Sequence, residues 1–173
     1  MEKLKKLIDS EQIQNRVKAL GLEITEHYKG RPLTVVCILN GAFVFCADLI
    51  RQIENDEINI EFMRLSSYGS SSVSSGKIQI IKDTETDLNG KDVLVVEDIV
   101  DTGRTLSFVM AHLKAKGASS VALCALIDKP SRRVVPVKTD WVGIEVPDTF
   151  IVGYGLDYDQ RYRHLPYIAE VEL

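Results

Sequence analysis

The sequence predicts an α/β fold in which a twisted, mainly parallel sheet is flanked by helices, with a small hood and a flexible loop. Three runs of apolar, largely β-branched residues, at 33–39, 93–96 and 120–127, indicate strands buried on both faces, as central parallel strands are. Segments with apolar residues at helical spacing alternate with these strands, which is typical of βαβ units. We therefore expect one layered domain over residues 1–173.

The first third of the chain predicts two βα steps. Apolar residues at helical spacing over 13–28 indicate an amphipathic helix, which Gly30 ends. The buried strand 33–39 follows and leads into the turn Asn40–Gly41. The pattern then predicts, in order, a helix over 43–53 and a strand over 58–64.

The serine-rich stretch that follows predicts a flexible loop over about 65–77. It has too little apolar surface to offset the entropy lost on ordering it. A strand over 77–82 returns from the loop, so the two flanking strands form a long hairpin. Composition alone favours a flexible linker here, and a lid over an active site is the alternative.

The second half predicts a complete βαβ unit and then a hood. The strand 93–96, a helix over 106–113 that Gly117 ends, and the strand 120–127 form the unit. Beyond it lie prolines and two short candidate strands, at 141–146 and 150–152. We expect the N-terminal segment and residues 129–173 to form the hood over one end of the sheet.

Composition excludes several classes of protein. The formal net charge of −4 gives no overall attraction to nucleic acid or to an anionic membrane. The three cysteines are odd in number and lie in apolar runs, which is typical of buried, reduced thiols. The N-terminus lacks the apolar core of a secretion signal, and no apolar stretch is long enough to span a bilayer. We expect a cytoplasmic protein.

Three acids, Glu97, Asp98 and Asp101, lie where the strand 93–96 ends. Ligands bind at the carboxyl ends of strands in open α/β sheets. Residues Asp101–Thr105 open the next helix, so their backbone N–H groups can hold a phosphate, with Gly103 allowing close approach. Acids there would repel an anion unless they face a diol, a proton to be removed or a divalent cation. The pattern indicates a phosphorylated sugar bound with Mg²⁺; helix capping by Asp101 or Thr102 is the alternative, and accounts for one acid only.

The run Val95–Thr105 resembles the phosphoribosyl-binding motif of the type I phosphoribosyltransferases. Four further segments, which extend the resemblance over most of the chain from about residue 30, are similar to segments of the hypoxanthine phosphoribosyltransferases: Leu39–Asp48, Leu65–Tyr68, Asp128–Arg133 and Pro147–Asp157. The resemblance implies a purine salvage enzyme that joins hypoxanthine or guanine to 5-phosphoribosyl 1-diphosphate, giving IMP or GMP and diphosphate. It also implies Mg²⁺ as cofactor and assembly into a homodimer or homotetramer.

By the same resemblance, Asp101 is the catalytic residue, a general base beside the purine ring. Lys129 donates to the 6-oxo group of the base, Phe150 stacks on its ring, and the backbone of Ile151 meets its edge. Residues expected to hold the phosphoribosyl diphosphate are Asn40, Gly41, Ser67, Tyr68, Glu97, Asp98, Asp101, Thr102, Gly103, Arg104, Thr105, Arg133, Asp157 and Arg163, and the expected metal ligands are Glu97, Asp98 and Asp157.

Four of these residues carry qualifications. Ser67 and Tyr68 match the pair with which family members close a loop over the diphosphate, which favours the lid reading. Asn40 stands where many relatives have a basic residue, so only the backbone of the Asn40–Gly41 turn is expected to face the anion. Arg133 either approaches the diphosphate or belongs to a solvated basic face.

Three alternative functions stay open. A phosphoribosyltransferase that prefers xanthine or guanine differs by a few contacts near residues 150–157. Some proteins of this fold are RNA-binding regulators, which the acidic balance of this chain disfavours. A catalytically silent sugar-phosphate binder is the third.

Overall fold

The structure is a computed structural model that describes residues 3–67 and 77–172. Its strands are β1 (Lys3–Ile8), β2 (Leu33–Leu39), β3 (Ile58–Ser67), β4 (Ile78–Lys82), β5 (Asp92–Val100), β6 (Ser120–Asp128), β7 (Trp141–Glu145), β8 (Ile151–Val152) and β9 (Ile168–Glu172). Six of them form a central sheet in the order β4-β3-β2-β5-β6-β7. All neighbours in it run parallel except the edge strand β4, which is antiparallel to β3. The predicted fold class and the β3–β4 hairpin are confirmed.

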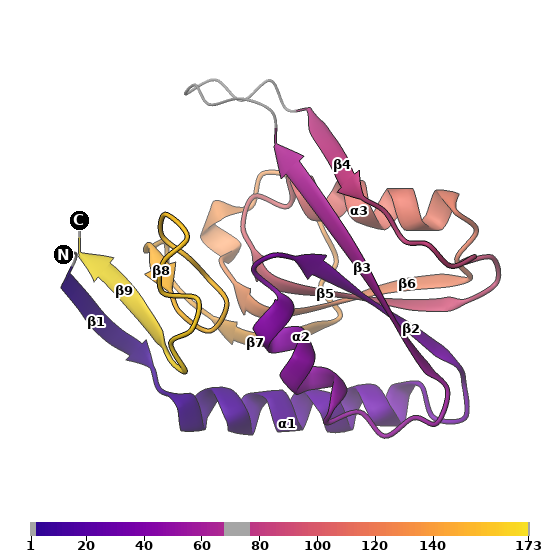
Figure 1. The fold of residues 1–173 in the computed structure, drawn as a ribbon, viewed down its shortest axis with the longest axis horizontal. Helices are drawn as coiled ribbons and strands as arrows, with labels where there is room; N and C mark the ends of the chain where they lie inside the picture. The colour runs from indigo at the N-terminus through magenta and orange to yellow at the C-terminus, as the bar shows by residue number, and fades with distance from the viewer. Residues whose placement is uncertain (1–2, 68–76, 173) are drawn as a thin grey trace.

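Helices cover both faces of this sheet (Figure 1). They are α1 (Ser10–His27), α2 (Phe43–Ile50) and α3 (Arg104–Ala115), with a 3₁₀ turn η1 over Pro130–Arg132. Side chains alternate across β5, so Leu94 and Val96 pack with α1 and α2 while Val93 and Val95 pack with α3. Both faces of the central strands are therefore buried, which is why those strands read as continuous apolar runs.

The helix α1 begins three residues earlier than its apolar repeat. Asp9 caps it by accepting a hydrogen bond from the Gln12 backbone N–H at 2.8 Å, and the Gln12 side chain accepts one from the Asp9 N–H at 3.0 Å. This reciprocal pair satisfies two N–H groups that a helix start leaves open. None of the helices among the described residues is long and apolar enough to cross a membrane.

The hood is a three-stranded antiparallel sheet in the order β1-β9-β8. Figure 1 shows β1 and β9 side by side near the two ends of the chain. The strand β7, which we expected in the hood, instead pairs in parallel with β6 and extends the central sheet. Trp141 at its start lies edge-on to His27 at a ring distance of 5.1 Å, so β7 is held by the end of α1.

The order of strands creates a crevice at one end of the central sheet. The chain leaves β2 towards β3 on one side, and it leaves β5 towards β6 on the other. The loops that follow β2 and β5 therefore diverge, and the carboxyl ends of these two neighbouring strands border an open space. Ligands of α/β proteins bind at such a switch point.

Candidate active site

Two strand ends meet closely at this crevice. A Cβ atom on Gly41, just after β2, would lie 1.7 Å from the Asp98 carboxylate oxygen Oδ2. A Cβ atom on Gly155 would lie 2.2 Å from the Gly41 carbonyl oxygen. Only glycines allow these approaches, so the Asn40–Gly41 turn lies packed between the end of β5 and residues 153–157. The peptide bond from Leu39 to Asn40 is cis.

Glu97 and Asp98 are not at the tip of β5 but inside it, because the strand continues to Val100. Both side chains are at least nine-tenths buried. Burial and the neighbouring Asp98 carboxylate raise the pKa of Glu97 well above its usual value. Burial also raises the pKa of Asp98, although hydrogen bonds from Glu97 and from the Ile99 N–H oppose it. A cation placed beside these two buried carboxylates would stabilise their charged forms.

The start of α3 is an open group of N–H donors. Gly103 is the N-cap residue, with φ of 85°, and as a glycine it has no side chain to cap the helix. Thr102 Oγ1 accepts a long hydrogen bond, at 3.5 Å, from the backbone N–H of Arg104, the first residue of α3. Among the described residues, Asp101 accepts no such bond, so the helix-capping alternative is wrong for Asp101 and holds for Thr102 through this one contact. Among the described residues, nothing in the protein accepts a hydrogen bond from the backbone N–H of Thr105 or Leu106. Free donors at a positive helix end form an anion site.

The loop before α3 is held from behind by the segment after β6. The Thr102 carbonyl accepts hydrogen bonds from the N–H groups of Val134 and Val135, both at 2.9 Å. Arg133 donates through Nε to the Asp101 carbonyl at 3.1 Å and pairs with Asp128. These contacts place the Arg133 guanidinium in support of the loop and not on a solvated basic face, and its approach to the diphosphate stays a prediction.

A cavity of about 390 Å³ lies beside Asp101 and is lined by the residues expected to hold the base. Lys129, only 8% exposed, donates from Nζ to the Thr149 carbonyl at 2.6 Å. Phe150 is 45% exposed and stands edge-on to Tyr158, with ring centres 5.6 Å apart. The cavity thus combines one buried cation with an accessible aromatic face, a combination suited to a flat polar ring.

Asp101 makes a contact that the sequence did not predict. Its Oδ1 accepts a hydrogen bond from Arg132 Nε at 2.9 Å, and Arg132 Nη1 lies 3.6 Å from Asp148 Oδ2. Both Arg132 and Asp148 line the cavity. An adjacent pair of arginines gives no indication of which one faces a site, so no sequence signal could have selected Arg132 over Arg133.

Asp157 lines the same cavity and pairs with Arg163, with Asp157 Oδ1 and Arg163 Nη2 3.0 Å apart. Arg163 also donates from Nη1 to the Gly155 carbonyl at 2.8 Å. It therefore braces the same segment that packs on Gly41. The remaining predicted positions are distributed as follows: Asn40, Arg104 and Thr105 are exposed, Ile151 is buried in β8, Ser67 ends β3, and Tyr68 lies outside the described residues, as does most of the predicted lid.

The three expected metal ligands do not form one cage. Within residues 3–67 and 77–172, no group of three or more His, Cys, Asp or Glu side chains is arranged to hold a metal ion. Glu97 and Asp98 adjoin Gly41, whereas Asp157 is bound to Arg163. Any Mg²⁺ here would need oxygen ligands from substrate and water, which is its usual way of binding.

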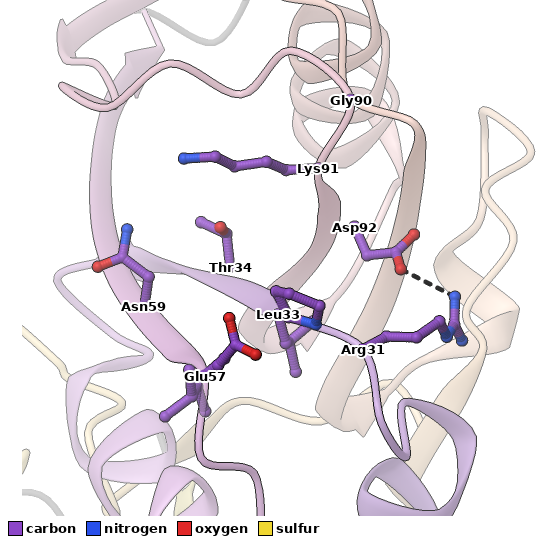
Figure 2. Close-up of a pocket in the computed structure, with 10 residues that line it drawn as sticks. Arg31, Leu33, Thr34, Glu57, Asn59, Gly90, Lys91 and Asp92 are labelled. Carbon is purple, nitrogen blue, oxygen red and sulfur yellow. Dashed lines mark hydrogen bonds and ion pairs between the residues drawn. The ribbon is translucent and has the colours of Figure 1, made fainter.

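A larger cavity, of about 690 Å³, lies at the opposite end of the central sheet (Figure 2). It is bordered by the amino ends of β2, β3 and β5, where Lys91 extends into it and Arg31 pairs with Asp92 at 2.8 Å. Neither the buried acids nor the start of α3 reaches it. Size therefore does not identify the site, and the carboxyl-end crevice is the better candidate because the chemically capable groups converge there.

Comparison with known proteins identifies the family of the chain. The phosphoribosyl transferase domain family matches residues 4–159. Hypoxanthine-guanine phosphoribosyltransferase of Bacillus subtilis is 49% identical over 165 residues, which are 95% of this chain and 91% of that protein. Hypoxanthine phosphoribosyltransferase of Escherichia coli is 47% identical over 169 residues, 96% of this chain and 94% of that one. A crystal structure of a hypoxanthine-guanine phosphoribosyltransferase from Bacillus anthracis is 44% identical, with a TM-score of 0.93 over 98% of this chain and 100% of the other.

Proposed function

Because the chain belongs to the phosphoribosyl transferase domain family, we propose that it is a purine salvage enzyme of the hypoxanthine phosphoribosyltransferase type. It joins hypoxanthine or guanine to 5-phosphoribosyl 1-diphosphate, giving IMP or GMP and diphosphate. The observation that carries the proposal is the start of α3, where the described residues offer no acceptor to the Thr105 and Leu106 N–H groups, beside Asp101 at the edge of a cavity that Lys129 lines. A phosphate site and a base site are thus adjacent, with a carboxylate between them.

The sugar phosphate is bound by the loop Asp101–Thr105. Its 5′-phosphate takes the free N–H groups at the start of α3, and the hydroxyls of Thr102 and Thr105 add donors. Gly103 cannot be replaced without loss, because its φ is positive and a Cβ there would lie 2.2 Å from the Val135 carbonyl oxygen. Glu97 and Asp98 face the ribose hydroxyls.

Asp101 accepts the proton that the purine loses as its nitrogen attacks the anomeric carbon. One carboxylate oxygen, Oδ1, is held by Arg132, which leaves Oδ2 for the proton. The departing diphosphate lies towards the Asn40–Gly41 turn and Arg163. Catalysis then depends mainly on holding base, sugar and leaving group in line.

Lys129 selects the base. An ammonium group has three donors, so Lys129 can keep its bond to the Thr149 carbonyl and also donate to a 6-oxo group. Adenine presents an amino group at that position and would leave a buried cation facing a donor. Phe150 is exposed enough to stack on the ring of the bound base.

The residues present fit Mg²⁺, since two buried carboxylates with raised pKa values lie together and, among the described residues, neither pairs with a cationic side chain. Glu97 and Asp98 would hold the ion on the ribose side, and Asp157 would hold one on the diphosphate side. When bound, it would neutralise charge on the leaving diphosphate. Assembly into a homodimer or homotetramer stays a prediction, which light scattering can check.

The test is an assay with purified protein, phosphoribosyl diphosphate, Mg²⁺ and each purine or pyrimidine base in turn, following nucleotide formation. The proposal expects product with hypoxanthine, with guanine, or with both, and little with adenine. Faster turnover of xanthine would favour the xanthine-preferring alternative. Failure to make nucleotide from either hypoxanthine or guanine would refute the proposal, and tight RNA binding would then favour the regulator.

A further inference from the structure

Arg132 lies between two carboxylates at the mouth of the base cavity. Its Nε binds Asp101 Oδ1 at 2.9 Å, and its Nη1 lies 3.6 Å from Asp148 Oδ2. The three side chains come from different parts of the fold. Asp101 precedes α3, Arg132 ends the turn η1, and Asp148 lies just before β8 of the hood. The guanidinium therefore joins the phosphate loop to the hood across the cavity.

Backbone hydrogen bonds around Arg132 support this contact. Arg132 N–H donates to the Lys129 carbonyl at 3.0 Å and closes the turn that Pro130 begins. Lys129, at the start of the same turn, binds the Thr149 carbonyl next to Asp148. One short turn thus sends two cationic side chains to two adjacent residues before β8, Lys129 to Thr149 and Arg132 to Asp148, and Arg132 also holds Asp101.

One hydrogen bond to a single carboxylate oxygen can orient a general base. The bond from Nε to Oδ1 restricts the rotation of the Asp101 carboxylate, and Oδ2 accepts no hydrogen bond from any described residue. A general base is effective when a third group orients it. When Asp101 becomes neutral on taking a proton, Asp148 still attracts the guanidinium and keeps it in place.

Resting on the function proposed above, we propose that Arg132 is a positioning residue for Asp101, holding Oδ1 so that Oδ2 receives the proton of the purine, with Asp148 as its anchor. The other charged groups around Asp101 do not compete for the role. Lys129 is bound to Thr149, Arg133 is bound to Asp128 and to the Asp101 carbonyl, and Asp157 is bound to Arg163.

The test is a double-mutant cycle between Arg132→Met and Asp101→Asn, measured as IMP formation at saturating phosphoribosyl diphosphate. In the native background we expect Arg132→Met to lower kcat about tenfold, with KM for hypoxanthine changed less than about twofold. In the Asp101→Asn background the same substitution should change kcat by less than about twofold, because the group it acts through has lost its function.

Two further variants make the result independent of one substitution. Arg132→Lys should retain more activity than Arg132→Met, since an ammonium pairs with Asp101 but cannot span both carboxylates. Asp148→Asn leaves Arg132 in place and should lower kcat by about threefold, again only when Asp101 is present.

A matched control exists at the other end of the sheet. Arg31 pairs with Asp92 at 2.8 Å, and the Arg31 side chain is 46% exposed (Figure 2). Arg132 pairs with Asp101 at 2.9 Å, and the Arg132 side chain is 45% exposed. Arg31→Met should leave kcat and KM unchanged. The inference is overturned if Arg132→Met has no effect, lowers kcat by the same factor in both backgrounds, or raises only KM. Failure of the proposed function looks different, because the native protein would then form no nucleotide from hypoxanthine or guanine.

Discussion

Gly41→Ala is expected to disable the site by displacing Asp98. The new methyl group would lie 1.7 Å from Asp98 Oδ2 and 2.8 Å from its Cγ, whereas ordinary contacts begin at 3.4 Å. One of the two must therefore move by about 1.7 Å. The Asn40–Gly41 turn cannot retreat, because its carbonyl already fills the space that a side chain on Gly155 would need. Asp98 must yield instead.

The displacement should reduce activity far more than stability. A misplacement of 1 Å at a reacting centre can lower the rate by about 100-fold, so we expect kcat/KM to fall at least that far. Overpacking of a buried site costs about 1–3 kcal/mol, which the fold can absorb. The assay is nucleotide formation from hypoxanthine at varied phosphoribosyl diphosphate, with urea unfolding measured in parallel.

Gly30→Ala is the opposite case and serves as the control. Gly30 has φ of 72° and open space around it, far from the site, so alanine adds backbone strain of about 1–2 kcal/mol without a clash. It should lower stability and leave kcat/KM unchanged. If Gly41→Ala keeps native kcat/KM, the close approach of β2 and β5 has no part in catalysis and the reasoning fails.

Three other perturbations test separate parts of the structure. Lys129→Met removes the donor now bound to the Thr149 carbonyl, so kcat/KM for hypoxanthine should fall about 100-fold and discrimination against adenine should be lost. Competition between hypoxanthine and adenine measures this discrimination. An unchanged preference for hypoxanthine would contradict the prediction. Phe150→Ala should raise KM for the base about tenfold and barely change Tm, since the ring is 45% exposed; a large fall in Tm would mean that the ring is structural. Burial alone would raise the pKa of Asp83, but hydrogen bonds from His112, Thr84 and Lys116 outweigh it and lower the pKa. The stability that these bonds give is present above about pH 4 and is lost as pH falls through the lowered pKa, so the difference in unfolding free energy between the native protein and Asp83→Asn should shrink at low pH; a difference that stays constant from pH 3 to 7 would refute this.

The central strands could be predicted from the sequence because burial on both faces leaves a continuous apolar run, as in Leu33–Leu39. The ends of elements were harder. The strand β5 continues past the apolar run that ends at Val96, because Glu97 and Asp98 are buried within it, and no hydrophobic pattern predicts buried acids.

Two strands depend on partners far along the chain. The strand β1 is mostly exposed and rich in lysine, and its pairing with β9 joins residues 3 and 172, so nothing local marks it as a strand. The short strand β7 contains Gly143 and lies between prolines, so it looked like part of an irregular cap. Gly143 in fact allows the close approach of β7 to β6, because a Cβ there would lie 2.4 Å from the Leu126 carbonyl oxygen.

Within the candidate site, sequence analysis predicted the groups that lie close together in one motif. It did not predict contacts between residues that only folding brings together. Asp101 and the start of α3 follow from adjacency in the sequence. The bridge from Arg132 to Asp148 does not, because it depends on how the turn η1 directs its last side chain.

The central claim is that Asp101 moves a proton at a site whose other groups bind the substrates, and Asp101→Asn tests it most directly. Asparagine keeps the shape of the side chain and cannot accept the proton. We expect kcat for hypoxanthine to fall at least about 100-fold while the Kd for IMP changes less than about threefold. If kcat and IMP binding weaken by the same factor, Asp101 is a binding group and the account is wrong.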